Sequence, residues 1–166
     1  MNKNKGFTLL ELVIATGIFS MISVASVWML FLSLNLRDLS SATIRTEESL
    51  RIFNQTFRLA SLNASTVTGG GTALLLKSAG ECWSFLYDQN LKNIKFDHVS
   101  QSGCVPNPSP TSLFFPSQTV VDNFSFSITS LPTGGRQISA LGSLTTFLPF
   151  NSYSETFQAT VTNVID

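Results

Sequence analysis

The sequence is poor in charge, and the charge that it has is balanced. Charged side chains make up 12% of the 166 residues, with 10 basic residues against 10 acidic ones. A neutral chain lacks the basic field that attracts nucleic acid or an anionic lipid surface. Hydrophobic residues make up 43%, which is more than a disordered chain carries. We therefore expect a folded protein without a nucleic-acid partner.

Residues that carry enzyme chemistry are scarce as well. His98 is the only histidine, so a Ser–His–acid triad would depend on it entirely, and no nucleophile motif accompanies it. A metal centre needs a cluster of ligands, which one histidine and two separated cysteines do not supply. Asp88 and Asp97 are carboxylates that nothing in the sequence brings together. The sequence therefore predicts a protein that is not an enzyme and that needs no metal, cofactor or small-molecule substrate.

Helix-breaking residues are almost missing from the first third of the chain. No proline occurs before Pro106, and Gly17 is the only glycine from residue 7 to residue 67. This scarcity predicts one helix over residues 7–62. Its second half, residues 37–62, continues as an amphipathic helix. The residues expected to face a domain recur at spacings of three and four: Leu36, Leu39, Thr43, Thr46, Leu50, Phe53, Phe57 and Ala60.

The first half of the helix, residues 7–36, is apolar on every side and carries one charged residue, Glu11. Thirty helical residues span about 45 Å, which exceeds the roughly 30 Å hydrocarbon core of a bilayer. Lys3 and Lys5 precede the segment, so its N-terminal end is expected to stay in the cytoplasm. An acidic side chain at the bilayer centre raises the free energy of membrane insertion by roughly 2.5–3.5 kcal/mol, and the cost for Glu11 is lower because it is expected to lie near the membrane interface.

Two ordinary membrane segments are alternatives. One is a secretory signal peptide, since Ser23 and Ala25 provide small residues for a cut before Ser26. The acid inside the apolar run and the continuation of that run to Leu36 argue against it. The other is a plain uncleaved anchor, which explains the length and leaves Glu11 unexplained. Such an anchor would hold a binding module outside the cytoplasm that does not polymerise.

The residues KGFTLLELVIA at positions 5–15 resemble the N-terminus of type IV prepilins and type II secretion pseudopilins. The resemblance implies a leader peptide over residues 1–6, which prepilin peptidase removes by cutting between Gly6 and Phe7. The same enzyme would N-methylate Phe7. It also implies a single-pass protein of the bacterial inner membrane with a periplasmic head. This protein would later join other pilin or pseudopilin subunits in a pilus or pseudopilus.

The resemblance supplies a reason for Glu11. This residue stands where the family carries its characteristic glutamate, four residues after the new terminus. Cleavage would expose an α-amine on Phe7, and a reference pKa of about 7.7–8.0 leaves that amine largely protonated at neutral pH. The resemblance implies that, in a filament, this cation pairs with the glutamate of a neighbouring subunit. A slip of one residue would leave both charges unpaired, so Glu11 is the candidate filament-assembly residue.

One departure distinguishes the chain from the major pilins. Major pilins usually carry a helix-kinking proline at the position that Trp28 holds here. The run ATGIF at residues 15–19 also replaces an isoleucine-rich stretch. Both differences favour a minor pilin or a J-type pseudopilin over a major pilin.

Residues 63–166 are expected to form a β-rich globular head. Alternation of apolar and polar residues predicts strands in ECWSFLYD (81–88), VVDNFSFSIT (120–129), ETFQATVTNVI (155–165) and, more weakly, IKFDHV (94–99). The amphipathic helix is expected to cover one face of an antiparallel sheet, which is an α+β, pilin-like architecture. The glycine-rich run TGGGT (68–72) is expected to be a flexible turn.

The two cysteines, Cys82 and Cys104, lie in this head. In an exported domain a structural disulfide is the usual state of such a pair, and free thiols are the alternative. Closing a loop of this length contributes about 3 kcal/mol by restricting the unfolded chain.

Overall fold

The structure is a computed structural model, and it describes residues 8–116, 118–132, 134–147 and 152–163. The chain divides into two units, Met1–Ser40 and Ser41–Asp166. One helix, α1 (Leu9–Asn63), belongs to both. The long helix predicted over residues 7–62 is confirmed, and within the described residues it begins at Leu9.

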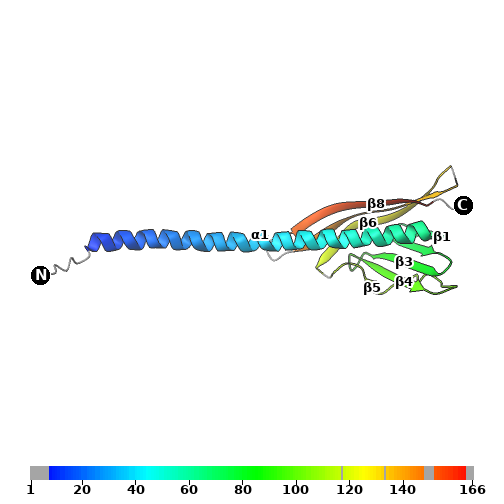
Figure 1. Ribbon diagram of the computed structural model, residues 1–166, viewed down its shortest axis with the longest axis horizontal. Coiled ribbons are helices and arrows are strands. Elements are labelled where there is room, and N and C mark those ends of the chain that lie inside the picture. Colours follow the sequence, from blue (N-terminus) through cyan, green and yellow to red (C-terminus); the bar gives the residue numbers. More distant parts are fainter. Residues whose placement is uncertain (1–7, 117, 133, 148–151, 164–166) are drawn as a thin grey trace. The chain divides into compact units, whose positions relative to one another are not determined.

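The described part of the second unit contains eight strands in two antiparallel sheets. Strands β1 to β5 form one sheet in sequence order, and the second sheet has the order β6-β7-β8. In Figure 1 the second sheet lies above the C-terminal part of α1 and the first sheet lies below it. The strands are β1 (Thr66–Gly70), β2 (Ala73–Lys77), β3 (Glu81–Asp88), β4 (Asn93–Ser100), β5 (Ser112–Leu113), β6 (Thr119–Ser130), β7 (Arg136–Phe147) and β8 (Ser152–Asn163).

The α+β architecture is confirmed, and the expectation of a single sheet is wrong. The four predicted strands correspond to β3, β4, β6 and β8. Strand β7 was not predicted, because its core-facing positions include the small residues Ala140 and Gly142 while the outward-facing Leu141 is apolar. Three consecutive leucines obscure the alternation in β2 in the same way. Without β1, β2, β5 and β7, the sequence offered too few strands for two sheets.

The prediction of a flexible turn at TGGGT is also wrong in part. Thr68–Gly70 belongs to β1, which pairs with β2 along its whole length. Gly71 and Thr72 alone form the connection between the two strands. Gly69 has a φ of 115°, and a Cβ there would collide with the carbonyl oxygen of Ala73. The glycines therefore allow a tight hairpin.

A cluster of phenylalanine rings forms the core of the second unit. Phe53 of α1 is fully buried, and its ring centroid lies 5.4–6.2 Å from those of six other phenylalanines. Those rings come from α1, from both sheets and from the segment before β6: Phe57, Phe85, Phe114, Phe115, Phe124 and Phe157. The helix and both sheets therefore share one core.

The stripe predicted on the helix is confirmed from Thr46 to Ala60 and is wrong at Leu36, whose side chain is 58% exposed. Thr46 is buried although it is polar. Its hydroxyl donates to the Ala42 carbonyl oxygen at 2.9 Å and lies 2.7 Å from the hydroxyl of Thr146. A buried hydroxyl with both bonds made is tolerated in a core. The buried helix residues are Ala42, Thr46, Leu50, Phe53, Phe57, Ala60 and Ser61.

The C-terminus of α1 is capped by a residue from the far end of β8. The side-chain amide of Asn163 donates hydrogen bonds to the carbonyl oxygens of Ser61 and Ala64, both at 2.7 Å. All three residues are buried. Carbonyls at a helix end have no partner within the helix, so this amide satisfies groups that water cannot reach.

Replacing Asn163 by alanine is expected to lower the free energy of unfolding by about 2–3 kcal/mol, because two buried carbonyls lose their donor. Ser61→Ala is the matched control. The Ser61 hydroxyl has no hydrogen-bond partner among the described residues, so its removal should change stability by less than about 0.5 kcal/mol. Urea unfolding of the full chain in detergent micelles, followed by circular dichroism, measures both. Equal losses for the two variants would contradict the capping role.

Candidate functional site

The predicted processing residues precede the described part of the chain. Gly6 and Phe7 lie within residues 1–7, outside the described residues. Cleavage between them and methylation of Phe7 therefore stay predictions. The structure describes the segment that follows this bond, beginning with Thr8.

Thr8 caps the N-terminus of α1. Its hydroxyl oxygen accepts a hydrogen bond from the N–H of Glu11 at 3.3 Å. Its carbonyl oxygen lies 3.0 Å from the same nitrogen and 3.2 Å from that of Leu12. These contacts satisfy N–H groups that a helix start leaves unpaired. Threonine followed three residues later by glutamate is the pattern of a capping box. The capping role of Thr8 was not predicted from the sequence, although the capping-box pattern of Thr8 and Glu11 indicates it.

Glu11 lies in the first turn of α1. Unpaired N–H groups give a helix N-terminus a partial positive charge that favours a carboxylate. The Glu11 side chain is exposed, and its carboxylate makes no hydrogen bond or ion pair with any described residue. The helix start thus gives one reason for an acid at this position, and it leaves the carboxylate oxygens available to a partner.

The helix residues of the first unit expose apolar side chains on every side. The most hydrophobic 18-residue window of α1 has a mean hydropathy of 2.0, and none of it is buried. A helix of this length and composition can cross a membrane. The exposed large residues in this stretch include Leu9, Leu10, Leu12, Val13, Ile14, Ile18, Phe19, Met21, Ile22, Val24, Val27, Trp28, Met29, Leu30, Phe31, Leu32, Leu34 and Leu36.

Hydroxyl groups within this apolar stretch bond to the helix backbone. Thr16 donates to the carbonyl oxygens of Leu12 and Val13, both at 3.0 Å. Serine hydroxyls make the same kind of bond one turn back, at distances of 2.8–2.9 Å: Ser20 to Gly17, Ser23 to Phe19 and Ser26 to Ile22. A polar group in hydrocarbon needs such an internal partner. These residues therefore fit a membrane-anchored helix.

Cys82 and Cys104 form a disulfide, as the sequence predicted. Cys82 lies on the face of β3 that points away from α1, because its neighbours Trp83 and Phe85 are the core residues. On the same outer face, Asp97 accepts a hydrogen bond from the side chain of Asn107 at 2.9 Å. The segment after β4 is thus fastened to the first sheet at two points, which is a structural role.

The remaining titratable candidates are separated in the structure. Asp88 pairs with Lys95 at 2.7 Å, and the hydrogen bond from Lys95 lowers the pKa of that carboxyl. Asp97 bonds to Asn107 instead. The ring of His98 stacks on Trp83, with the ring centroids 5.3 Å apart. Among the described residues, no three His, Cys, Asp or Glu side chains are grouped to hold a metal ion.

Comparison with known proteins identifies one match. Residues 1–27 match the family model described as the prokaryotic N-terminal methylation motif. The match includes Gly6, Phe7 and Glu11 and extends over 27 of the 166 residues. No curated protein and no solved structure matches the chain. The motif supports a type IV pilin-like protein with a structural role.

Proposed function

We propose that the chain is a minor pilin or pseudopilin, a structural or assembly-priming subunit of a type IV pilus or of a type II secretion pseudopilus. Prepilin peptidase removes residues 1–6 and methylates Phe7. The chain then leaves the inner membrane and enters the filament through its N-terminal helix. The match of residues 1–27 to the methylation motif is the observation that carries the proposal.

The start of α1 supports the proposed assembly step. After cleavage, the new cationic amine would belong to the residue directly before the capping residue Thr8 in the sequence, and it would add to the positive charge of the helix N-terminus. The positively charged amine and the partial positive charge of the helix N-terminus repel each other, and a nearby carboxylate stabilises both. Glu11 is exposed in the first turn and has no ionic partner among the described residues. When helices pack in a low-dielectric bundle, an amine without a carboxylate would be strongly destabilising.

The course of the helix supports a minor rather than a major subunit. Trp28 occupies the place where major pilins usually carry a kinking proline, and the structure has regular helix through this residue. Proline would remove one helical hydrogen bond and bend the axis. A helix that continues without a proline at this position differs from the major-pilin pattern, which favours a subunit present in few copies.

Mass spectrometry of the N-terminal peptide tests the processing. The protein is purified from membranes of cells that contain prepilin peptidase, and N-methyl-Phe7 is the expected terminus. A terminus at Ser26 would identify a secretory signal, and an intact Met1 would identify a plain anchor; either contradicts the proposal. Gly6→Leu is the control, because the resemblance places glycine at the end of the leader. This variant should keep Met1 while the same helix remains in the membrane.

A further inference from the structure

Strand β8 provides an open edge of the second sheet. The order β6-β7-β8 leaves this strand paired on one side only, over 12 residues. The opposite edge strand, β6, is tied to the rest of the unit by a bridge between Gly71 and Phe126 and by a hydrogen bond from Val121 to Lys92. Among the described strands of this sheet, β8 therefore has the free edge. Long free edges pair readily with another extended chain unless they are covered.

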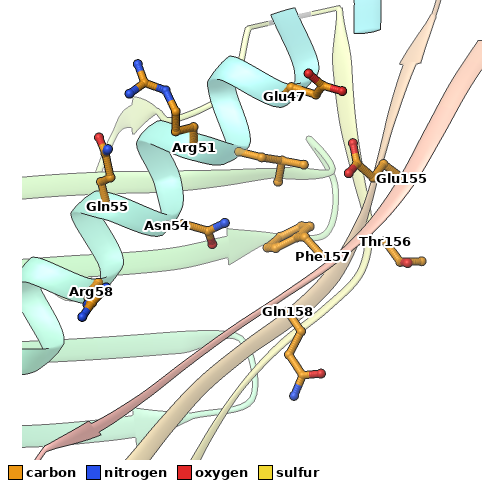
Figure 2. A pocket seen from close by; sticks show the side chains of 10 residues that line it. Glu47, Arg51, Asn54, Gln55, Arg58, Glu155, Thr156, Phe157 and Gln158 are labelled. Atoms are coloured by element: carbon orange, nitrogen blue, oxygen red, sulfur yellow. The ribbon is translucent and has the colours of Figure 1, made fainter. Parts of the chain in front are cut away.

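An open groove of about 540 Å³ lies between α1 and β8 (Figure 2). The helix forms one wall, and residues 155–158 of β8 form the other. The buried side chains of Leu50 and Phe157 form the apolar floor of the groove. The other lining side chains are polar. The groove thus offers an apolar floor next to an unpaired strand edge. Backbone hydrogen bonds at such an edge give affinity, and the side chains beside it give specificity.

The two ends of the groove carry opposite charge. Glu47 of α1 and Glu155 of β8 are neighbours at one end, seen at the upper right of Figure 2. Tyr153 lies beside them. Its hydroxyl donates to Glu155 at 3.4 Å, and burial together with both carboxylates raises the pKa of this phenol. Arg58 lies three helical turns further along the same wall.

These charges are uncompensated in the part of the chain that the structure describes. Arg51, also in the groove, pairs with Glu48 at 2.7 Å. By contrast, Glu47, Glu155 and Arg58 make no ion pair with a described residue. An occupant of the groove therefore meets two carboxylates without an ion-pair partner at one end and one guanidinium without an ion-pair partner at the other.

We propose that an extended segment of a different subunit adds to β8 as a further strand. It places a basic residue at Glu47 and Glu155, an apolar residue over the floor and an acidic residue at Arg58. This inference rests on the proposed function, because subunits of one filament share an orientation. A second copy in that orientation would pair β8 with β8 in parallel and bring another Glu155 to the acidic end. Like charges on adjacent strands repel, so a different subunit with the opposite charge order is the better occupant.

Fluorescent peptides test the charge order on the full chain in detergent micelles. The peptides, of about ten residues, alternate valine and threonine. The first carries lysine near one end and glutamate near the other, the second carries two lysines, and the third carries two glutamates. By fluorescence anisotropy, the first peptide should bind about fivefold more tightly than either of the others, as expected for one repulsive contact replaced by an attractive one. Amide hydrogens of residues 155–158 should exchange more slowly when it binds.

Arg58→Glu is the informative variant, and Arg45→Glu is its control. With Arg58→Glu both ends of the groove are acidic, so the two-lysine peptide should become the tightest ligand. Arg45→Glu makes the same charge change on the same helix outside the groove, and it should leave the order of the three affinities unchanged.

Three results would overturn the inference. They are equal affinities for the three peptides, no protection of the β8 amides on binding, and a concentration-dependent dimer whose β8 amides are protected without peptide. The last result would assign the edge to a second copy. The N-terminal peptide, measured separately, reports on the proposed function. If the mature chain begins with N-methyl-Phe7 and binds no peptide, only the proposal about the groove is wrong. If the chain is unprocessed and binds the peptides as described, only the proposed function is wrong.

Discussion

Replacing Glu11 by glutamine is expected to stop the chain from entering a filament while cleavage and methylation continue. Glutamine keeps the size of the side chain and the capping-box pattern with Thr8, and it removes the charge. The amine of the neighbouring subunit would then lack its partner among packed helices, at a cost of about 3–5 kcal/mol. That corresponds to a loss of about a hundredfold to a few thousandfold in the assembly equilibrium. Immunoblots of sheared filaments and of membranes measure how the protein is distributed between the two fractions.

Thr8→Ala separates the charge from the cap. This variant removes the hydroxyl that accepts the Glu11 N–H, which costs about 1 kcal/mol of helix stability, and it leaves the carboxylate in place. We expect it to assemble. If Glu11→Gln assembled normally and Thr8→Ala did not, Glu11 would serve the helix start alone, and the pairing with the Phe7 amine would be wrong.

Replacing Phe53 by alanine is expected to remove about 3–5 kcal/mol from the stability of the second unit. A typical domain has only about 5–15 kcal/mol in total, so much of the population would unfold near 37 °C. The size of the effect follows from position. The ring is fully buried and contacts rings of both sheets, including Phe85 and Phe157. A cavity there would loosen the contact of α1 with each sheet.

The adjacent residue provides the control. Ile52 is 45% exposed on the same turn of α1, and Ile52→Ala should change stability by less than about 1 kcal/mol because alanine favours the helix. Near-UV circular dichroism of the full chain in micelles, followed against urea, reports on the aromatic cluster. Similar midpoints for Phe53→Ala and for the unchanged chain would show that the cluster does not hold the helix to the sheets.

Local pattern was sufficient for the helix and for part of the sheets. Residues 37–62 repeat apolar side chains at helical spacing, and burial follows that repeat from Thr46 to Ala60. Strand β3 was predicted to the residue, since Trp83, Phe85 and Tyr87 alternate with smaller or more polar neighbours. In both cases one face of an element packs against a core, and the periodicity records that face directly.

The local sequence pattern was insufficient to predict a strand where close packing requires a small residue. At Gly142 in β7, a Cβ would lie 2.7 Å from the ring of Phe124. The position is glycine because two phenylalanine side chains fill the space beside it, and a missing side chain gives no periodic signal. Leu36 shows the converse case, since it continues the repeat and yet is exposed.

The sequence by itself determined the candidate processing segment, because that segment is read as a linear string: a short basic leader, Gly6, Phe7, Glu11 and an apolar helix without breakers. The tertiary structure decided what depends on residues far apart in the chain. It joined Asn163 to the end of α1, built two sheets around Phe53, and brought Glu155 beside Glu47 at a free strand edge. These contacts join residues that lie about thirty to about a hundred positions apart in the chain, and no local repeat records which side chains will meet.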